Sequence, residues 1–119
     1  MNDRHNTIHY IELPLSHSKA TRDFYGQVFN WEFQDWGPDY MSFAGAGLDG
    51  GFNRLRPAGQ RGRGALVILF ADDLDAKLQQ VIAAGAEIAE GIFEFPGGRR
   101  FHFIDPNGSE IAVWGEAVS

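Results

Sequence analysis

Apolar positions recur along this chain with two different periods, and the same succession of periods occurs twice. An apolar run at residues 7–13 precedes a stretch in which apolar residues return every three or four positions, up to Asn30. A second apolar run at residues 65–71 precedes another stretch of that kind, which ends at Gly85. Short runs with alternating apolar and polar residues follow in each half. Because alternation indicates strands and a three-to-four spacing indicates helices, the sequence predicts two β-α-β-β-β repeats.

In the first half, one helix is expected between strands. Pro14 is expected to end the first strand because proline cannot donate to a sheet ladder, and Ser16 or Ser18 offers a cap for the helix. Asn30 is expected to stop that helix, since it tolerates a left-handed backbone. Further strands are predicted at residues 31–36 and 40–44, and a turn or bulged strand entry is predicted at residues 45–51.

The second half repeats this order with clearer turn signals. Residues 65–71 are almost purely apolar, which predicts a strand buried on both faces. Asp72 or Asp73 is expected to cap the next helix, and Gly85 to end it. The remaining strands are predicted at residues 86–89, 90–95, 101–104 and 110–114, with a tight turn at residues 105–108 between the last two.

The composition is that of an ordinary globular protein. The chain has 119 residues, of which 44% are hydrophobic and 22% charged. This composition predicts one α+β domain over residues 1–119. Within it we expect a first module at about 7–56, a linker at 57–64 and a second module at about 65–115.

Charge and cysteine content exclude several classes of function. The net charge of −6 disfavours binding to nucleic acid or to an anionic membrane, and no apolar run approaches the ~20 residues that a membrane-spanning helix needs. The absence of cysteine removes disulfides, thiolate catalysis and cysteine zinc sites. The first six residues lack the apolar segment of a secretory signal, so a cytoplasmic location is expected. Small molecules are the expected partners.

Four short motifs occur in a characteristic order along the chain. They are Phe24-Tyr25 with Val28-Phe29, Ala71-Asp72-Asp73-Leu74-Asp75, Ala83-Ala84-Gly85-Ala86, and Asp105-Pro106-Asn107-Gly108. In order and spacing the chain resembles the vicinal oxygen chelate superfamily, which includes glyoxalase I, extradiol dioxygenases and bleomycin- and fosfomycin-resistance proteins. The resemblance extends over about residues 7–115. The segments Glu12-Leu13-Pro14 and Phe29-Asn30-Trp31-Glu32-Phe33 are most similar to a bacterial glyoxalase-related branch.

The resemblance implies a fold and a place for the site. Two βαβββ modules are expected to form a curled mixed sheet around a cup, and two chains are expected to form a homodimer. In metal-dependent members, four inward His or Glu side chains hold one divalent ion. The matching positions here are His9, Gly51 or Phe52, Leu66 and Ala112. Because only His9 has a donor atom suited to a metal, we expect no metal and no other cofactor, and neither glyoxalase I activity nor extradiol cleavage.

The function expected is binding or turnover of an unidentified small molecule in the strand-lined cup. The candidate lining residues are His9, Glu12, Trp36, Tyr40, Phe52, Arg54, Leu66, His102, Ala112 and Trp114. Each has a purely structural alternative: a strand histidine, a buried ion pair of Glu12, or aromatic side chains that only fill the core. Clustered arginines from Arg54 to Arg63 form either a solvated connector or an anion-binding lid.

Two other classes of function stay open. The first is a metal-dependent lyase, isomerase or dioxygenase whose ligands lie at unexpected positions, such as His9 and His102 with Glu12 or Glu110. The second is an interaction module without a small ligand, for which the sequence offers no positive sign.

Overall fold

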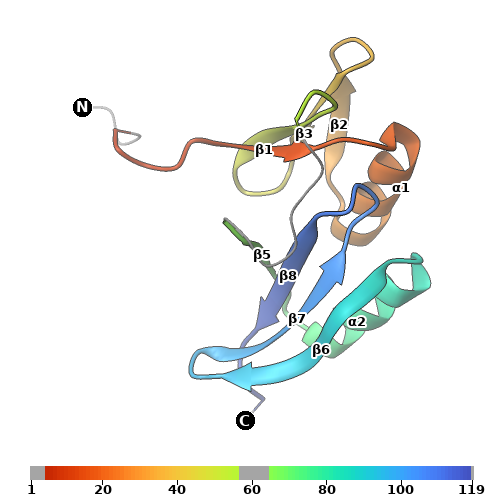
Figure 1. Cartoon of the computed structure of the whole chain (residues 1–119). Helices are drawn as coiled ribbons and strands as arrows, with labels where there is room; N and C mark the ends of the chain where they lie inside the picture. The colour runs from red at the N-terminus through yellow and green to blue at the C-terminus, as the bar shows by residue number, and fades with distance from the viewer. Residues whose placement is uncertain (1–4, 57–64, 119) are drawn as a thin grey trace. The chain divides into compact units, whose positions relative to one another are not determined.

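The structure, a computed structural model, describes residues 5–56 and 65–118. The chain divides into a first unit (residues 1–57) and a second unit (residues 58–119), and each holds one helix and one four-stranded mixed sheet (Figure 1). This confirms the predicted α+β class with two β-α-β-β-β repeats. The linker predicted at 57–64 lies outside the described residues, and the union of both units in one domain stays a prediction.

In the first unit, the helix follows the first strand along the chain and precedes the second strand. Its elements are β1 (Tyr10–Pro14), α1 (Ser18–Phe29), β2 (Glu32–Asp35), β3 (Tyr40–Ala44) and β4 (Asp49–Asn53). The strand order is β1-β4-β3-β2, in which β1 runs parallel to β4 and the other pairs are antiparallel.

Three local details of the first unit differ from the sequence-based expectations. Pro14 lies inside β1, in register with Asn53, because β1 is an edge strand and tolerates a missing N–H group. The N-cap residue is His17, whose backbone is extended and whose side chain makes no capping hydrogen bond. The Thr21 hydroxyl donates a hydrogen bond to the His17 carbonyl at 2.6 Å. The predicted turn at 45–51 ends early, since β4 begins at Asp49.

The core of the first unit is aromatic. Tyr25 on α1 stacks on Trp31 with ring centroids 4.6 Å apart, and it also contacts Phe52 of β4 at 5.3 Å. Trp31 in turn stacks on Phe43 of β3 at 4.6 Å. Asn30 adopts φ 63°, which confirms the predicted helix stop and lets the chain reverse toward β2.

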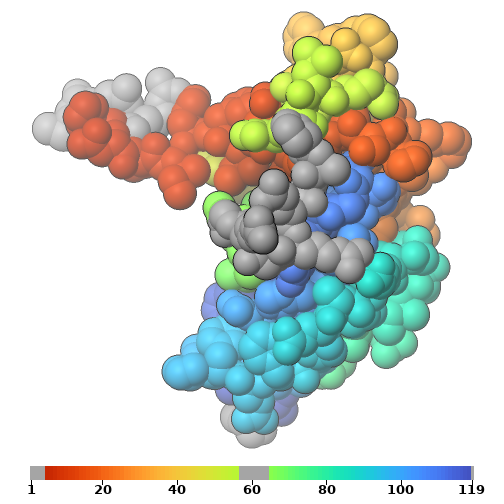
Figure 2. Space-filling view, viewed as in Figure 1, coloured from red at the N-terminus to blue at the C-terminus, as the bar shows by residue number. Residues whose placement is uncertain are grey.

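The second unit repeats the same topology. Its elements are β5 (Val67–Phe70), α2 (Leu74–Ala83), β6 (Glu87–Phe95), β7 (Gly98–Ile104) and β8 (Glu110–Gly115), in the strand order β5-β8-β7-β6. β5 runs parallel to β8, and the other pairs are antiparallel. Most side chains of β6 are exposed or half-buried, and they form much of the surface of this unit that Figure 2 shows.

Two strand predictions in the second unit are wrong. The strands predicted at 86–89 and 90–95 are one strand, β6, whose register against β7 shifts on either side of Glu90, so that bulges take up the extra residues. The strand predicted to be buried on both faces is β5, yet Ile68 is 43% and Phe70 49% exposed. β5 lies at the edge of its sheet, and α2 covers only the sheet face opposite to the side chains of Ile68 and Phe70.

The turn and cap chemistry of the second unit follows the predictions. Asp73 caps α2 by accepting a hydrogen bond from the Ala76 N–H at 3.0 Å, and Gly85 has φ 91° just past the helix. In the β7–β8 turn, Oδ1 of Asp105 accepts from the backbone N–H groups of Asn107 and Ser109, each at 2.9 Å. These bonds fix the hairpin that carries the candidate site.

Candidate functional site

Strand register divides the second sheet into a helix-covered face and an open face. Arg99, Phe101 and Phe103 of β7 share one face, and Arg99 reaches Asp75 of α2 with an ion pair of 3.1 Å. On β8, Gly115 lies directly under Leu74, whose Cβ lies 3.1 Å from where an alanine Cβ would stand at this position. α2 therefore packs on this face. The residues between these positions point to the other side of the sheet, which we call the open face.

Four sequence-predicted candidates lie on this open face. Ala112 of β8 is in register with His102 on one neighbouring strand, β7, and with Ile68 on the other neighbouring strand, β5. Trp114 pairs with Phe70, and their rings meet edge to face at a centroid distance of 5.1 Å. Leu66 lies just before β5 and two residues before Ile68, so its side chain points to the same face; it is 36% exposed. The structure thus brings Leu66, His102, Ala112 and Trp114 together on one face.

His102 and Glu110 form a close polar pair on the open face. Nδ1 of His102 lies 2.7 Å from Oε2 of Glu110, and the His102 residue is only 7% exposed. A carboxylate only accepts hydrogen bonds, so Nδ1 carries the proton and donates. The other ring nitrogen, Nε2, is buried and has no hydrogen-bond partner in the part of the chain that the structure describes. The pair therefore orients the His102 ring and leaves its Nε2 buried and unpaired among the described residues.

Arg100 is held on the open face by aromatic rings. Its guanidinium carbon lies 5.3 Å from the ring centroid of Phe93 and 5.5 Å from that of Phe95, both on β6. Its Nε is buried without a hydrogen-bond partner, and no ion pair of Arg100 occurs within residues 5–56 and 65–118. Phe93 also contacts the His102 ring at 5.8 Å. Arg100 is thus a cation whose stem is packed but whose charge is uncompensated.

The first sheet also has a face that α1 does not cover, and this face is polar. Tyr10, Glu12, Tyr40 and Asn53 share it by register. The hydroxyl oxygens of Tyr10 and Tyr40 lie 2.5 Å apart, and Nδ2 of Asn53 donates to Oε1 of Glu12 at 3.1 Å. The ring of Tyr40 lies against Gly51, where any Cβ would collide with it. Glu12 and Tyr40 are therefore neighbours in one hydrogen-bonded cluster.

The cluster makes the Tyr40 phenol harder to deprotonate. Burial raises the pKa of its phenol well above the ordinary value, and the hydrogen bond that Tyr40 makes with Tyr10 and the nearby Glu12 carboxylate raise the pKa further. Like any tyrosine, Tyr40 is neutral at physiological pH, and the raised pKa extends that neutral state to more alkaline solution.

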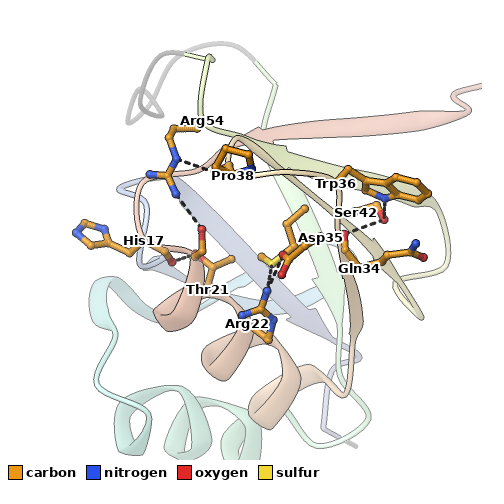
Figure 3. Close-up of polar contacts among 11 residues, drawn as sticks. His17, Thr21, Arg22, Gln34, Asp35, Trp36, Pro38, Ser42 and Arg54 are labelled. Carbon is orange, nitrogen blue, oxygen red and sulfur yellow. Dashed lines mark hydrogen bonds and ion pairs between the residues drawn. The ribbon is translucent and has the colours of Figure 1, made fainter.

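Two other candidates of the first unit have structural roles. Arg54 donates from Nε to the Pro38 carbonyl at 3.2 Å and from Nη2 to the Ser18 hydroxyl at 2.9 Å, which ties the β2–β3 turn to the start of α1 (Figure 3). Phe52 is fully buried against Tyr25 on the helix side of its sheet. The prediction that Phe52 lines the site is therefore wrong, because register turns its side chain toward α1.

Trp36 and His9 lie at the margins of the first sheet. Trp36 follows β2, is exposed, and donates from Nε1 to the Ser42 hydroxyl at 2.9 Å (Figure 3). His9 precedes β1 and is exposed. A shallow hollow of about 160 Å³ lies beside β2 and β3 and is lined by Glu32, Phe33, Gln34, Ser42, Phe43 and Ala44.

The residues at the predicted metal-ligand positions do not fit a four-ligand ion. Leu66 and Ala112 lie on the open face of the second sheet but have no donor atoms, and the Tyr40 ring occupies the space above Gly51. Residues 5–56 and 65–118 contain no group of three or more His, Asp or Glu side chains arranged to hold a metal. No described helix is long and apolar enough to cross a bilayer.

Arg100 and Phe93, which lie together in the candidate site, were not predicted from the sequence. The sequence contained a signal for Arg100, because this residue lies two positions before His102 on a strand and such residues share a face. Phe93 could not be placed from the sequence, since the register shifts in β6 decide which of its residues faces Arg100.

Comparisons with known proteins agree on one family. A model of the family described as the Glyoxalase/Bleomycin resistance protein/Dioxygenase superfamily matches residues 7–113. The chain is 22% identical over 120 residues to CFP32 of Mycobacterium bovis, a protein named as a glyoxylase. That match covers 93% of this chain and 46% of CFP32, so the chain spans about half the length of the curated relatives it matches.

Solved structures share the fold at low identity. A glyoxalase-related enzyme from Fulvimarina pelagi superposes with a TM-score of 0.74 at 16% identity, covering 93% of this chain and 88% of the other. A family enzyme from Burkholderia phytofirmans PsJN gives 0.74 at 19% identity, with 90% and 96% covered. TnmS3 from Streptomyces sp. CB03234, described as an antibiotic binding protein, gives 0.68 at 22% identity, with 94% and 97% covered.

Proposed function

The chain belongs to the Glyoxalase/Bleomycin resistance protein/Dioxygenase superfamily, and on this premise we propose that it binds a small organic molecule on its open sheet face without the help of a metal ion. The observation that carries the proposal is the open face of the second sheet. There the side chains of Ile68 and Phe70 are 43% and 49% exposed, beside Trp114 and the buried polar pair of His102 and Glu110. Binding sites for organic ligands combine an apolar lining with a few polar groups in this way.

The first unit, taken by itself, also carries polar and aromatic groups on the sheet face that α1 does not cover. Tyr40 is a neutral donor next to Glu12, and Trp36 presents an exposed indole ring. The description of TnmS3 as an antibiotic binding protein supports an organic ligand. A homodimer belongs to this proposal and rests on the resemblance to the family, while a cytoplasmic location stays a prediction from the sequence.

The test uses the full chain after dialysis against EDTA. Bleomycin, doxorubicin and tetracycline are titrated into the protein by calorimetry, with and without added Mn²⁺, Ni²⁺ or Zn²⁺. We expect at least one compound to bind the metal-free protein, and its affinity to change less than threefold when metal is added. Phe70→Ser should weaken that binding about tenfold, because it removes an exposed ring from the open face. Leu55→Ser is the matched control, since Leu55 is an exposed apolar residue of the first unit.

Two results would contradict the proposal. Binding that occurs only with a divalent ion would instead favour a metal-dependent lyase or dioxygenase with unusual ligands. Equal binding by the Phe70→Ser variant and the wild type would place the ligand elsewhere.

A further inference from the structure

The open face of the second sheet contains two buried nitrogen atoms without partners. Nε2 of His102 and Nε of Arg100 are both inaccessible to solvent and unpaired among the described residues. A buried polar atom without a partner costs free energy, so native structures rarely keep one unless another group satisfies it. Nε of Arg99 on the covered face is likewise buried and unpaired. The two atoms on the open face differ because they lie beside the exposed side chains of Ile68 and Phe70, which indicates a place where a ligand completes the hydrogen bonding.

The two nitrogens differ in the chemistry that they accept. Nε2 of His102 has a free lone pair in the neutral ring, because the proton lies on Nδ1 toward Glu110. It therefore accepts a hydrogen bond from a hydroxyl group. Arg100 is a permanent cation with donors only, and its planar fork matches a carboxylate. The two side chains therefore suit a ligand that carries one hydroxyl donor and one anionic acceptor.

The neighbouring charges leave that preference in place. Glu110 is engaged by His102, and Glu90, which is in register with His102, is exposed, so that solvent and salt screen its charge. The Arg100 guanidinium is oriented by Phe93 and Phe95 and not by a carboxylate. Its charge is thus available to a ligand.

The surroundings of the two groups are aromatic. Phe70 and Trp114 lie beside Arg100 on the same face, since Trp114 is in register with both Arg100 and Phe70. Residues two apart on a strand have Cα atoms about 7 Å from each other, a span that one substituted benzene ring bridges. Aromatic rings stack favourably on such walls.

We propose that the open face of the second sheet recognises an aromatic hydroxy acid, whose carboxylate binds Arg100 and whose hydroxyl donates to His102. This inference rests on the proposed small-molecule function and names the class of ligand. Glu110 is a positioning residue that fixes the ring tautomer of His102.

The test compares three probes by calorimetry on the full chain: 3-hydroxybenzoate, benzoate, which lacks the hydroxyl, and 3-hydroxybenzamide, which lacks the charge. Wild-type protein should bind 3-hydroxybenzoate at least tenfold more tightly than either analogue. Arg100→Gln should abolish the preference for acid over amide and keep the preference for the hydroxyl. Lys19→Gln, which removes an exposed cation from α1, is the matched control and should change neither preference.

A second variant tests His102 without leaving a buried charge. The double variant His102→Phe with Glu110→Leu replaces both partners by apolar groups, which is tolerated better than removal of one partner. It should abolish the preference for 3-hydroxybenzoate over benzoate and keep the preference for acid over amide. A melting temperature for each variant identifies any that fails to fold, and in that case the selectivity of the wild-type protein among the three probes still decides the inference.

The outcomes separate this inference from the proposed function. If an antibiotic of the panel binds through Phe70 but wild-type protein binds the acid and the amide within twofold, the hydroxy-acid inference is wrong and the proposed function stands. If Arg100→Gln keeps the acid preference, Arg100 is not the anion site. If none of the six compounds binds, both proposals fail.

Discussion

Nδ1 of His102 lies 2.7 Å from Oε2 of Glu110, and this contact sets the proton position on the imidazole ring. Because the carboxylate only accepts, neutral His102 should be in the Nδ1–H tautomer. Long-range ¹H–¹⁵N spectra of histidine side chains distinguish the tautomers directly. The exposed His5 provides a mixed-tautomer reference in the same spectrum. A neutral His102 with its proton on Nε2 would contradict the arrangement.

Removal of Glu110 should destabilise the protein. Glu110→Ala leaves Nδ1 of His102 buried without its acceptor, which typically costs about 1–3 kcal/mol of unfolding free energy. Urea denaturation at pH 7 measures the loss. Glu94→Ala is the control, because Glu94 is exposed on β6 and its removal should change the unfolding free energy by less than about 0.5 kcal/mol. Equal effects of the two substitutions would mean that the pair adds nothing to stability.

Tyr40 should make stability fall at high pH. Its pKa is raised above the ordinary value of 10.0 by burial, by Tyr10 and by Glu12. Below pH 10 the phenol is protonated in both the folded and the unfolded chain, and the contribution is fully present. Above pH 10 the unfolded chain loses its proton first, so the unfolding free energy falls as pH rises toward the folded pKa. Urea titrations at pH 9, 10 and 11 should show this slope, and Tyr40→Phe should flatten it. An unchanged slope in that variant would show that other groups cause the loss.

Gly50 and Gly51 should respond differently to alanine. A Cβ at Gly50 would collide with the Ile11 carbonyl of the neighbouring strand, whereas a Cβ at Gly51 would meet the outer end of the Tyr40 side chain, which can move aside by rotation. Gly50→Ala should therefore cost about 3 kcal/mol in urea denaturation, and Gly51→Ala about 1 kcal/mol. Gly51→Ala should also weaken the high-pH slope, because Tyr40 must leave its cluster. A larger loss for Gly51→Ala than for Gly50→Ala would contradict this.

The sequence predicted the order of elements well because each element has a local cause. Asp73 caps α2, Asn30 ends α1 with a left-handed backbone, and Asp105 organises the last turn through two backbone N–H groups. These effects act within a few residues, so the sequence alone reveals them. The β5 strand shows the limit. Its apolar run predicted burial on both faces, but burial depends on which elements cover a strand, and β5 lies at a sheet edge.

The candidate site was predicted in part. His102, Ala112 and Trp114 were identified by residue type and spacing, and strand register brings them to one face. Phe52 was misplaced because the parity of β4 depends on where that strand begins within a glycine-rich segment. The uncompensated charge of Arg100 could not be predicted, since it depends on the absence of an acidic partner within the described tertiary structure.

The central claim is that an organic ligand occupies the open face of the second sheet. The most direct test is a ¹H–¹⁵N NMR titration of the EDTA-treated protein with bleomycin, doxorubicin, tetracycline and 3-hydroxybenzoate in turn. We predict that a binding compound shifts the backbone signals of Phe70, Arg100, His102 and Trp114 most strongly, while signals of α2 on the covered face stay nearly unchanged. Spectra that none of the four compounds perturbs, or shifts confined to α2, would contradict the claim.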